Sequence, residues 1–156
     1  MSIVVFAEFD DGAYKKSSLE ALSAGRSIAE QIQETVIAVQ MDGDVQADIL
    51  AQHGAHKVVQ ASGNYGAFAS DSWSQAFSQI CQELGASLVL ISNTYCGKSM
   101  APRVAFQLKA DMASNVVSMP KTDNGFSVKR GVFSGKAFAW VQLKSPVGVG
   151  FDSQFV

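Results

Sequence analysis

The sequence predicts a three-layer α/β/α domain with a mostly parallel sheet and an antiparallel, β-rich C-terminal part. Two observations support this. Short apolar runs alternate with helix-length segments up to about residue 117, and extended runs without a helix between them follow. The chain has 156 residues, 47% hydrophobic and 17% charged. This length and composition suit one domain, spanning 1–156, with a sizeable core.

The first half of the chain contains three expected strands and three expected helices. The strands are Ile3–Phe9, Val36–Val39 and Val58–Val59. Ser17 and Ser18 are candidate caps for the first helix. Its expected buried face is Leu19, Leu22, Gly25, Ala29 and Ile32. A short helix over 45–52 follows the turn at 42–44. The third helix has the clearest period and ends at Gly85; its buried stripe is Trp73, Phe77, Ile80 and Leu84. Cys81 lies one position off that stripe.

The central stretch, 86–115, predicts a strand, a loop and a helix before the next strand. Leu88–Ile91 is an apolar run typical of a strand buried on both faces. Polar turn residues follow at 92–94, and a helix is expected from about Lys98, with Pro102 in its first turn. Met100, Val104 and Leu108 give its apolar face. The loop lies at the carboxyl end of a parallel strand, where ligands and partners commonly bind.

The C-terminal part predicts antiparallel strands. The turn at 122–125 separates extended runs, and Phe126–Phe133 and Ala137–Leu143 follow without a helix between them. Residues 147–155 form one more extended segment. The expected sheet is therefore mostly parallel, with antiparallel strands added at its C-terminal end.

Composition excludes several classes of function. A net charge of -2 with no basic stripe argues against a nucleic-acid partner. No signal peptide and no apolar run long enough for a membrane span is visible, so we expect a cytoplasmic protein that does not insert into membranes. Cys81 and Cys96 lack metal-type spacing and are expected to be buried or incidental thiols.

The residues that carry recognisable chemistry are few. Gly97-Lys98-Ser99 between a strand and a helix is similar to the end of a phosphate-binding loop. That loop needs a glycine where this chain has Ser92. His53 and His56 have no cysteine or carboxylate ligand beside them, so a surface role is expected. No nucleophile elbow or dinucleotide fingerprint is present. From the residues alone we predict an α/β domain that is not an enzyme by itself.

Two segments resemble the alpha subunit of electron transfer flavoproteins. Thr94–Ala105 is similar to that family's threonine, glycine-lysine, proline-arginine-x-alanine signature, and Arg130–Ala137 resembles a second family stretch, Arg-Pro-Ile-Tyr-Ala-Gly-Asn-Ala. The opening Val4–Glu8 and the connection Gly54–Val58 also fit. The departures are Gly131 for proline, Phe133 for tyrosine, Lys136 for asparagine, and Asn115 where the family commonly has aspartate.

The resemblance implies the N-terminal domain of an alpha subunit. The family carries electrons from flavin dehydrogenases to a membrane quinone oxidoreductase, in processes that include fatty acid beta-oxidation. FAD is held by the C-terminal domain of the alpha subunit and AMP by the beta subunit. By this analogy, the chain is a scaffold that pairs with a beta subunit in a heterodimer, acts as part of an electron carrier and binds no cofactor itself. The alternative is a small adenine-nucleotide-binding domain or a universal-stress-type module, which would use the loop after residue 91.

Eight residues in the two motifs are the candidates for an interface. They are Gly97, Lys98, Pro102, Arg103, Arg130, Phe133, Gly135 and Lys136. No catalytic or metal-binding residue is expected. The β-rich tail holds more large hydrophobic residues than one sheet face needs, namely Phe126, Val132, Phe133, Phe138 and Trp140. We therefore expect the partner to bind there, with Lys129, Arg130 and Lys136 at the rim. The alternatives are that these hydrophobes are core, or that the partner binds at 93–103.

Overall fold

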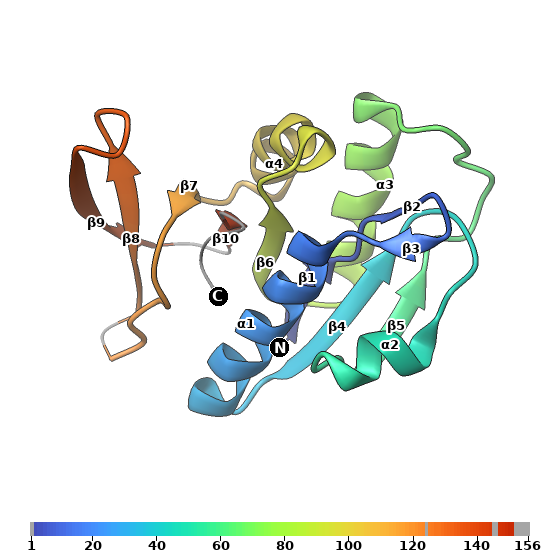
Figure 1. Cartoon of the computed structure of the whole chain (residues 1–156), viewed down its shortest axis with the longest axis horizontal. Coiled ribbons are helices and arrows are strands. Elements are labelled where there is room, and N and C mark those ends of the chain that lie inside the picture. Colours follow the sequence, from blue (N-terminus) through green and yellow to red (C-terminus); the bar gives the residue numbers. More distant parts are fainter. Residues whose placement is uncertain (1, 124, 145–146, 152–156) are drawn as a thin grey trace.

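The computed structural model describes residues 2–123, 125–144 and 147–151 (Figure 1). One sheet of eight strands is covered by helices on both faces, so the predicted three-layer architecture is confirmed. The strand order is β5-β4-β1-β6-β10-β7-β8-β9. Neighbouring strands from β5 to β7 are parallel, whereas β8 pairs with β7 and with β9 in antiparallel fashion.

The parallel part of the sheet is built from six short strands. They are β1 (Ser2–Phe6), β4 (Thr35–Gln40), β5 (Lys57–Gln60), β6 (Ala86–Ser92), β7 (Met112–Val116) and β10 (Val147–Phe151). The antiparallel strands are β8 (Phe126–Val132) and β9 (Ala137–Leu143). The helices are α1 (Lys16–Ile32), α2 (Ala47–Gln52), α3 (Ser70–Glu83) and α4 (Tyr95–Leu108).

Alternate side chains of the central strands feed two separate cores. Ile3 and Val5 pack with α1 and α2 on one face of the sheet, whereas Val4 and Phe6 pack with α3 and α4 on the other. This alternation follows from the two-residue period of a strand. Gly25 lets α1 approach the sheet closely, because a Cβ there would lie 3.2 Å from the side chains of Leu90 and Val5.

Several predicted boundaries at the N-terminal end were wrong. The first strand ends at Phe6, and a short hairpin follows, formed by β2 (Phe9–Asp10) and β3 (Ala13–Tyr14). Lys15 rather than a serine precedes α1, and it makes no side-chain cap bond. The hydroxyl of Ser18 instead accepts a hydrogen bond from the Glu8 amide at 3.0 Å. The serine therefore ties the helix to the end of β1.

The buried faces of α1 and α3 also differ from the predictions. Ile28 is fully buried on α1, whereas Leu19 and Ile32 are only partly buried. On α3, Cys81 is fully buried beside Trp73 and Phe77. Ile80 and Leu84 are partly buried, and Leu84 follows the last helical residue. The true stripe of α3 therefore includes Cys81.

The α4 helix begins three residues earlier than predicted, at Tyr95, so Pro102 lies inside it rather than in its first turn. Thr94 is the N-cap, and its side chain accepts a hydrogen bond from the Gly97 amide at 3.0 Å. Pro102 cannot donate to the Lys98 carbonyl one turn earlier, but both residues are exposed, so water can satisfy that carbonyl.

The C-terminal strands occupy two different places in the sheet. The last described strand, β10, is parallel and lies between β6 and β7. The hairpin of β8 and β9 extends the sheet beyond β7 and projects from the body (Figure 1). We call β8, β9 and the turn between them, residues 126–143, the arm. The predicted extended segment is confirmed over 147–151, and its remainder lies outside the described residues, as do part of the turn at 122–125 and the break at 145–146.

Candidate functional site

The switch point of the sheet lies between β1 and β6. From β1 the chain proceeds outward through β4 and β5, then returns to the other side of β1 to form β6. Open α/β sheets usually bind ligands outside the carboxyl ends of two such strands. Here that position holds Glu8, which is 7% exposed, and Thr94 donates a 2.6 Å hydrogen bond to its Oε2.

A cleft of about 490 Å³ opens beside this contact. Its walls include four carboxylates and the aromatic rings of Phe9, Phe68 and Trp73. The four carboxylates come from Glu8, Asp10, Asp11 and Asp42. Lys15 balances the charge of only one of them, Asp10, through an ion pair at 3.4 Å. The cleft as a whole is therefore acidic. Such a site repels phosphates.

Cys96 lies at the same cleft and is not an activated nucleophile. Burial, together with the neighbouring Glu8 carboxylate, raises the pKa of its thiol to about 11. Reactive cysteines have a lowered pKa. Cys81 is fully buried, and desolvation raises the pKa of its thiol to about 12. Both cysteines are free thiols, as expected.

The start of α4 is not arranged as a phosphate-binding loop. The Gly97 amide donates to the Thr94 side chain, and the Lys98 amide donates to the Thr94 carbonyl at 2.8 Å. A Cβ on Gly97 would overlap the carbonyl oxygen of Ser92 and lie 3.0 Å from Ile91. Gly97 is therefore required for close packing of α4 on the end of β6. The diphosphate of FAD or the phosphate of AMP does not fit this edge, because these amides are occupied and the neighbouring cleft is acidic.

The first motif divides between the two sides of α4. Gly97, Lys98 and Pro102 line a recess of about 80 Å³ that also includes Ser114 of β7. Arg103 points to the other side, where it forms an ion pair with Asp71 of α3. Arg103 and Pro102 line a second depression there, of about 410 Å³, so the structure separates Arg103 from Gly97 and Lys98 but not from Pro102.

The second motif forms a groove at the tip of the arm. Arg130, Phe133 and Gly135 line this groove of about 680 Å³ together with Asn115 and Phe138. We call it the arm groove. Phe133, Ser134 and Gly135 have φ values of 51°, 55° and 81°, which form a tight turn and leave the Phe133 ring 81% exposed. Lys136 is exposed in the same turn.

The two motifs meet at the end of β7. Ser114 lines the recess beside α4, and its Oγ accepts a hydrogen bond from Arg130 Nη2 at 3.3 Å. Next to it, Asn115 accepts a hydrogen bond from Asn93 at 3.4 Å and lines the arm groove. Segments more than twenty-five residues apart in the sequence therefore flank one strand end.

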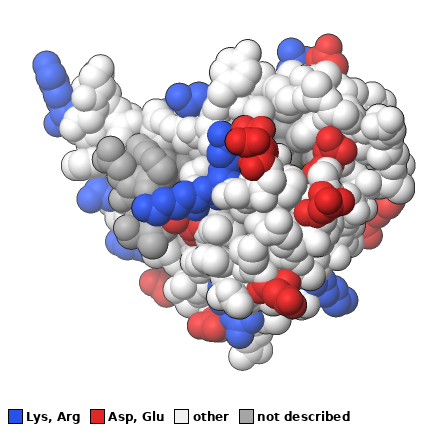
Figure 2. All heavy atoms as spheres, turned by 45° about the vertical axis from the view of Figure 1, so that its right-hand side comes forward, with Lys and Arg blue, Asp and Glu red and all other residues white. Residues whose placement is uncertain are grey.

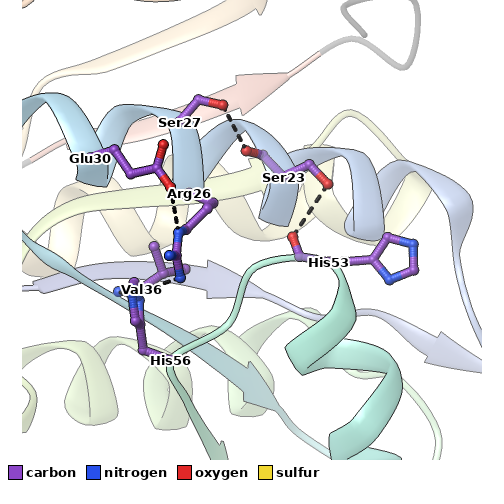
Figure 3. Close-up of polar contacts among 7 residues, drawn as sticks. All are labelled: Ser23, Arg26, Ser27, Glu30, Val36, His53 and His56. Atoms are coloured by element: carbon purple, nitrogen blue, oxygen red, sulfur yellow. Dashed lines mark hydrogen bonds and ion pairs between the residues drawn. The ribbon is translucent and has the colours of Figure 1, made fainter.

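Both histidines contact neighbouring elements through their main chain or ring (Figure 3). His56 Nδ1 accepts a hydrogen bond from the Val36 amide at 3.0 Å, and its Nε2 lies 2.8 Å from Arg26 Nη1. His53 Nδ1 lies 2.8 Å from the Ile49 carbonyl oxygen. Across the described ranges, no group of three or more histidine, cysteine or acidic side chains is arranged to hold a metal ion.

Sequence reasoning missed Glu8 as a site residue. A local signal was present, because Glu8 is a single carboxylate immediately after a continuous apolar strand. Its contact with Thr94, eighty-six residues away, is tertiary and has no local signature.

The fold and this edge define a class: an open, mostly parallel α/β domain whose switch point holds a carboxylate in place of a phosphate site. The sequence profile described as "Electron transfer flavoprotein domain" matches residues 3–149, so the chain belongs to that family. This confirms the resemblance noted from the two motifs.

The curated relatives include alpha subunits. The electron transfer flavoprotein subunit alpha of Bacillus subtilis (strain 168) is 28% identical over 148 residues, covering 93% of this chain and 45% of that protein. The subunit alpha of Pseudomonas aeruginosa is 30% identical over 161 residues, covering 98% and 50% respectively. Protein FixB of Clostridium saccharobutylicum is 27% identical, covering 88% and 42%. The chain thus spans about half the length of these relatives.

Among solved structures, a universal stress protein in complex with cAMP matches with a TM-score of 0.44 and 20% identity. The match covers 68% of this chain and 88% of that chain. Within the described ranges, no helix is both long and apolar enough to cross a membrane.

Proposed function

We propose that this chain acts as the N-terminal scaffold part of an electron transfer flavoprotein alpha-type subunit. The observation that carries the proposal is the family match over residues 3–149, together with alpha-subunit relatives that cover most of the chain. In this role the chain is part of an electron carrier rather than an enzyme. It works in the cytoplasm between flavin dehydrogenases and a quinone oxidoreductase.

The chain itself holds neither cofactor in this proposal. The acidic cleft and the occupied amides of Gly97 and Lys98 support placing FAD and AMP outside it, in a C-terminal FAD domain and in a beta-type partner. The same features disfavour an adenine-nucleotide-binding module, because the four carboxylates lie where the phosphates would bind.

The surface around the end of β7 is the proposed contact with the beta-type subunit. It includes Gly97, Lys98 and Pro102 on one side, and Arg130, Phe133, Gly135 and Lys136 on the other. Exposed rings support this placement, since Phe133, Phe138 and Trp140 are 81%, 58% and 49% exposed. Aromatic residues are enriched at protein interfaces.

Co-purification with the beta-type subunit encoded in the same genome tests the proposal. We expect a one-to-one complex on size-exclusion chromatography with light scattering, and a colourless preparation of the chain alone. Saturable binding of AMP or ATP to the chain alone, with no binding of the beta-type subunit, would instead identify a nucleotide-binding module.

A further inference from the structure

Arg130 is a partly buried cation without a counter-ion among the described residues. Its Nε is buried and has no hydrogen-bond partner. Within the described part of the chain, its guanidinium makes one hydrogen bond, the 3.3 Å contact from Nη2 to Ser114 Oγ. None of the ion pairs in the described ranges involves it. A guanidinium has five N–H donors, so most of the hydrogen-bonding capacity of Arg130 is unused.

An unpaired and partly desolvated charge is costly, which makes a missing anionic partner the simplest physical explanation. The other two arginines show the contrast. Arg26 pairs with Glu30 at 2.9 Å, and Arg103 pairs with Asp71. Only Arg130 lines a large groove without an acidic side chain in its lining.

The groove itself favours an ion pair. Val117, Phe133 and Phe138 provide apolar walls next to Arg130. When a partner covers the groove, these walls exclude water and lower the local dielectric constant, which strengthens the attraction between opposite charges. A planar guanidinium also matches a carboxylate with two parallel hydrogen bonds.

The charge of the whole arm points to an acidic partner. Residues 126–143 contain Lys129, Arg130 and Lys136 and no aspartate or glutamate. Residues 1–116 contain twelve carboxylates and seven cations. Figure 2 shows the projection at the upper left ending in a cationic side chain, with the carboxylates mainly over the body.

Lys129 of the arm and Lys121, which precedes it in the chain, lie over exposed aromatic rings of the arm. Lys129 Nζ is 4.5 Å from the centroid of Phe138, and Lys121 Nζ is 4.2 Å from that of Trp140. Exposed aromatic rings are typical anchors of an interface, and the two lysines add positive charge beside them.

We propose that the arm groove receives an aspartate or glutamate side chain of the beta-type subunit, which pairs with Arg130. This assignment rests on the proposed function and adds the chemistry of the contact. The lysines around the rings steer the acidic face of the partner toward the groove, and Arg130 provides the specific contact.

The test measures affinity for the beta-type subunit by calorimetry, and the thermal midpoint of the free chain, for three variants. Arg130→Gln should weaken binding tenfold or more, because it leaves a partner carboxylate buried and unpaired. The midpoint of the free chain should not fall. Arg130→Lys keeps the charge but loses the planar group that can make two parallel hydrogen bonds, so its affinity should lie between those of Arg130→Gln and wild type. Arg26→Gln is the matched control and should change affinity less than twofold.

The salt dependence of the binding affinity distinguishes the ion pair from the other contacts. Affinity of the wild-type chain should fall as salt rises, and that of Arg130→Gln should fall less. Equal affinity of wild type and Arg130→Gln would overturn the arm assignment while leaving the proposed function intact. Failure of the wild-type chain to bind the beta-type subunit would overturn both.

Two further results would contradict the proposal. A large drop in the thermal midpoint of Arg130→Gln would make its role structural. Stabilisation of the wild-type chain by inorganic phosphate or ADP, lost in Arg130→Gln, would make the groove a site for small anions.

Discussion

The hydroxyl of Thr94 joins three elements by making two hydrogen bonds at once. It donates to the buried carboxylate of Glu8 at 2.6 Å and accepts from the Gly97 amide at 3.0 Å. Glu8 follows β1, Thr94 follows β6, and Gly97 lies in the first turn of α4. The contact therefore fixes the start of α4 relative to the switch point of the sheet.

Replacing Thr94 with valine removes both hydrogen bonds while keeping the shape of the side chain. Loss of an N-cap costs about 0.5–2 kcal/mol, and an unsatisfied buried acceptor costs about 1–3 kcal/mol. We expect Thr94→Val to lower the free energy of unfolding by about 2–4 kcal/mol, measured by urea denaturation. Thr94→Ser keeps the hydroxyl and should lose less than half as much. Equal losses in both variants would show that the methyl group contributes as much as the hydroxyl.

Gly97 is predicted to tolerate no side chain. An added Cβ would overlap the Ser92 carbonyl oxygen, a backbone atom that cannot rotate away. Overpacking of a core commonly costs about 1–3 kcal/mol and more where backbone must move, so Gly97→Ala should cost about 3 kcal/mol or more. Gly131→Ala is the control, because the nearest atom to its added Cβ is Val117 Cγ1 at 3.9 Å. A stable Gly97→Ala chain with an unchanged midpoint would contradict the close approach of α4 to β6.

The sequence predicted the elements whose signals are local. The alternation of apolar runs and helical periods identified the parallel strands and the helices that cover them. The start of α4 was misplaced, because Pro102 was taken as a first-turn residue although Thr94 is the cap. The hairpin formed by β2 and β3 was missed, because strands of two residues show no period.

The remaining features depend on contacts between distant segments. Nothing local places β10 between β6 and β7, since its neighbours are set by the whole sheet. The same holds for the candidate site. Gly97, Arg130, Phe133 and Gly135 were identified through resemblance. The structure was needed to show that the two motifs meet at Ser114 and that Arg130 has no counter-ion among the described residues.

Phe77 of α3 is expected to be a major contributor to core stability. It is fully buried, and its ring meets Phe6 edge-on at 5.4 Å between centroids. Phe77→Ala should cost about 3–5 kcal/mol in the free energy of unfolding, from lost burial and the cavity left behind. Phe106→Ala removes a ring that is 83% exposed and should change the midpoint little. Similar denaturation midpoints for the two variants would show that the face of α3 is misassigned.

Cys81 makes the stability of the chain fall at alkaline pH. Burial raises the pKa of its thiol from 9.0 to about 12 in the folded state, so the folded chain keeps a proton that the unfolded chain loses. Below pH 9.0 the thiol is protonated in both states, so this group does not change the stability with pH. Between pH 9.0 and about 12 it ionises in the unfolded state alone, which favours unfolding. The cost is about 1.4 kcal/mol for each pH unit within that window.

Cys81→Ala removes this ionisation. We expect the difference in unfolding free energy between wild type and variant to be constant from pH 7 to pH 8.5, and to shift in favour of the variant at pH 10, measured by urea denaturation under reducing conditions. Cys96→Ala is the comparison, and its window closes earlier because the pKa of that partly buried thiol is raised only to about 11. Because the loss of packing does not depend on pH, the pH-dependent part of each difference reports the ionisation of that thiol. Parallel stability curves for wild type and Cys81→Ala through pH 10 would mean that the thiol at this position is accessible to water and ionises equally in both states.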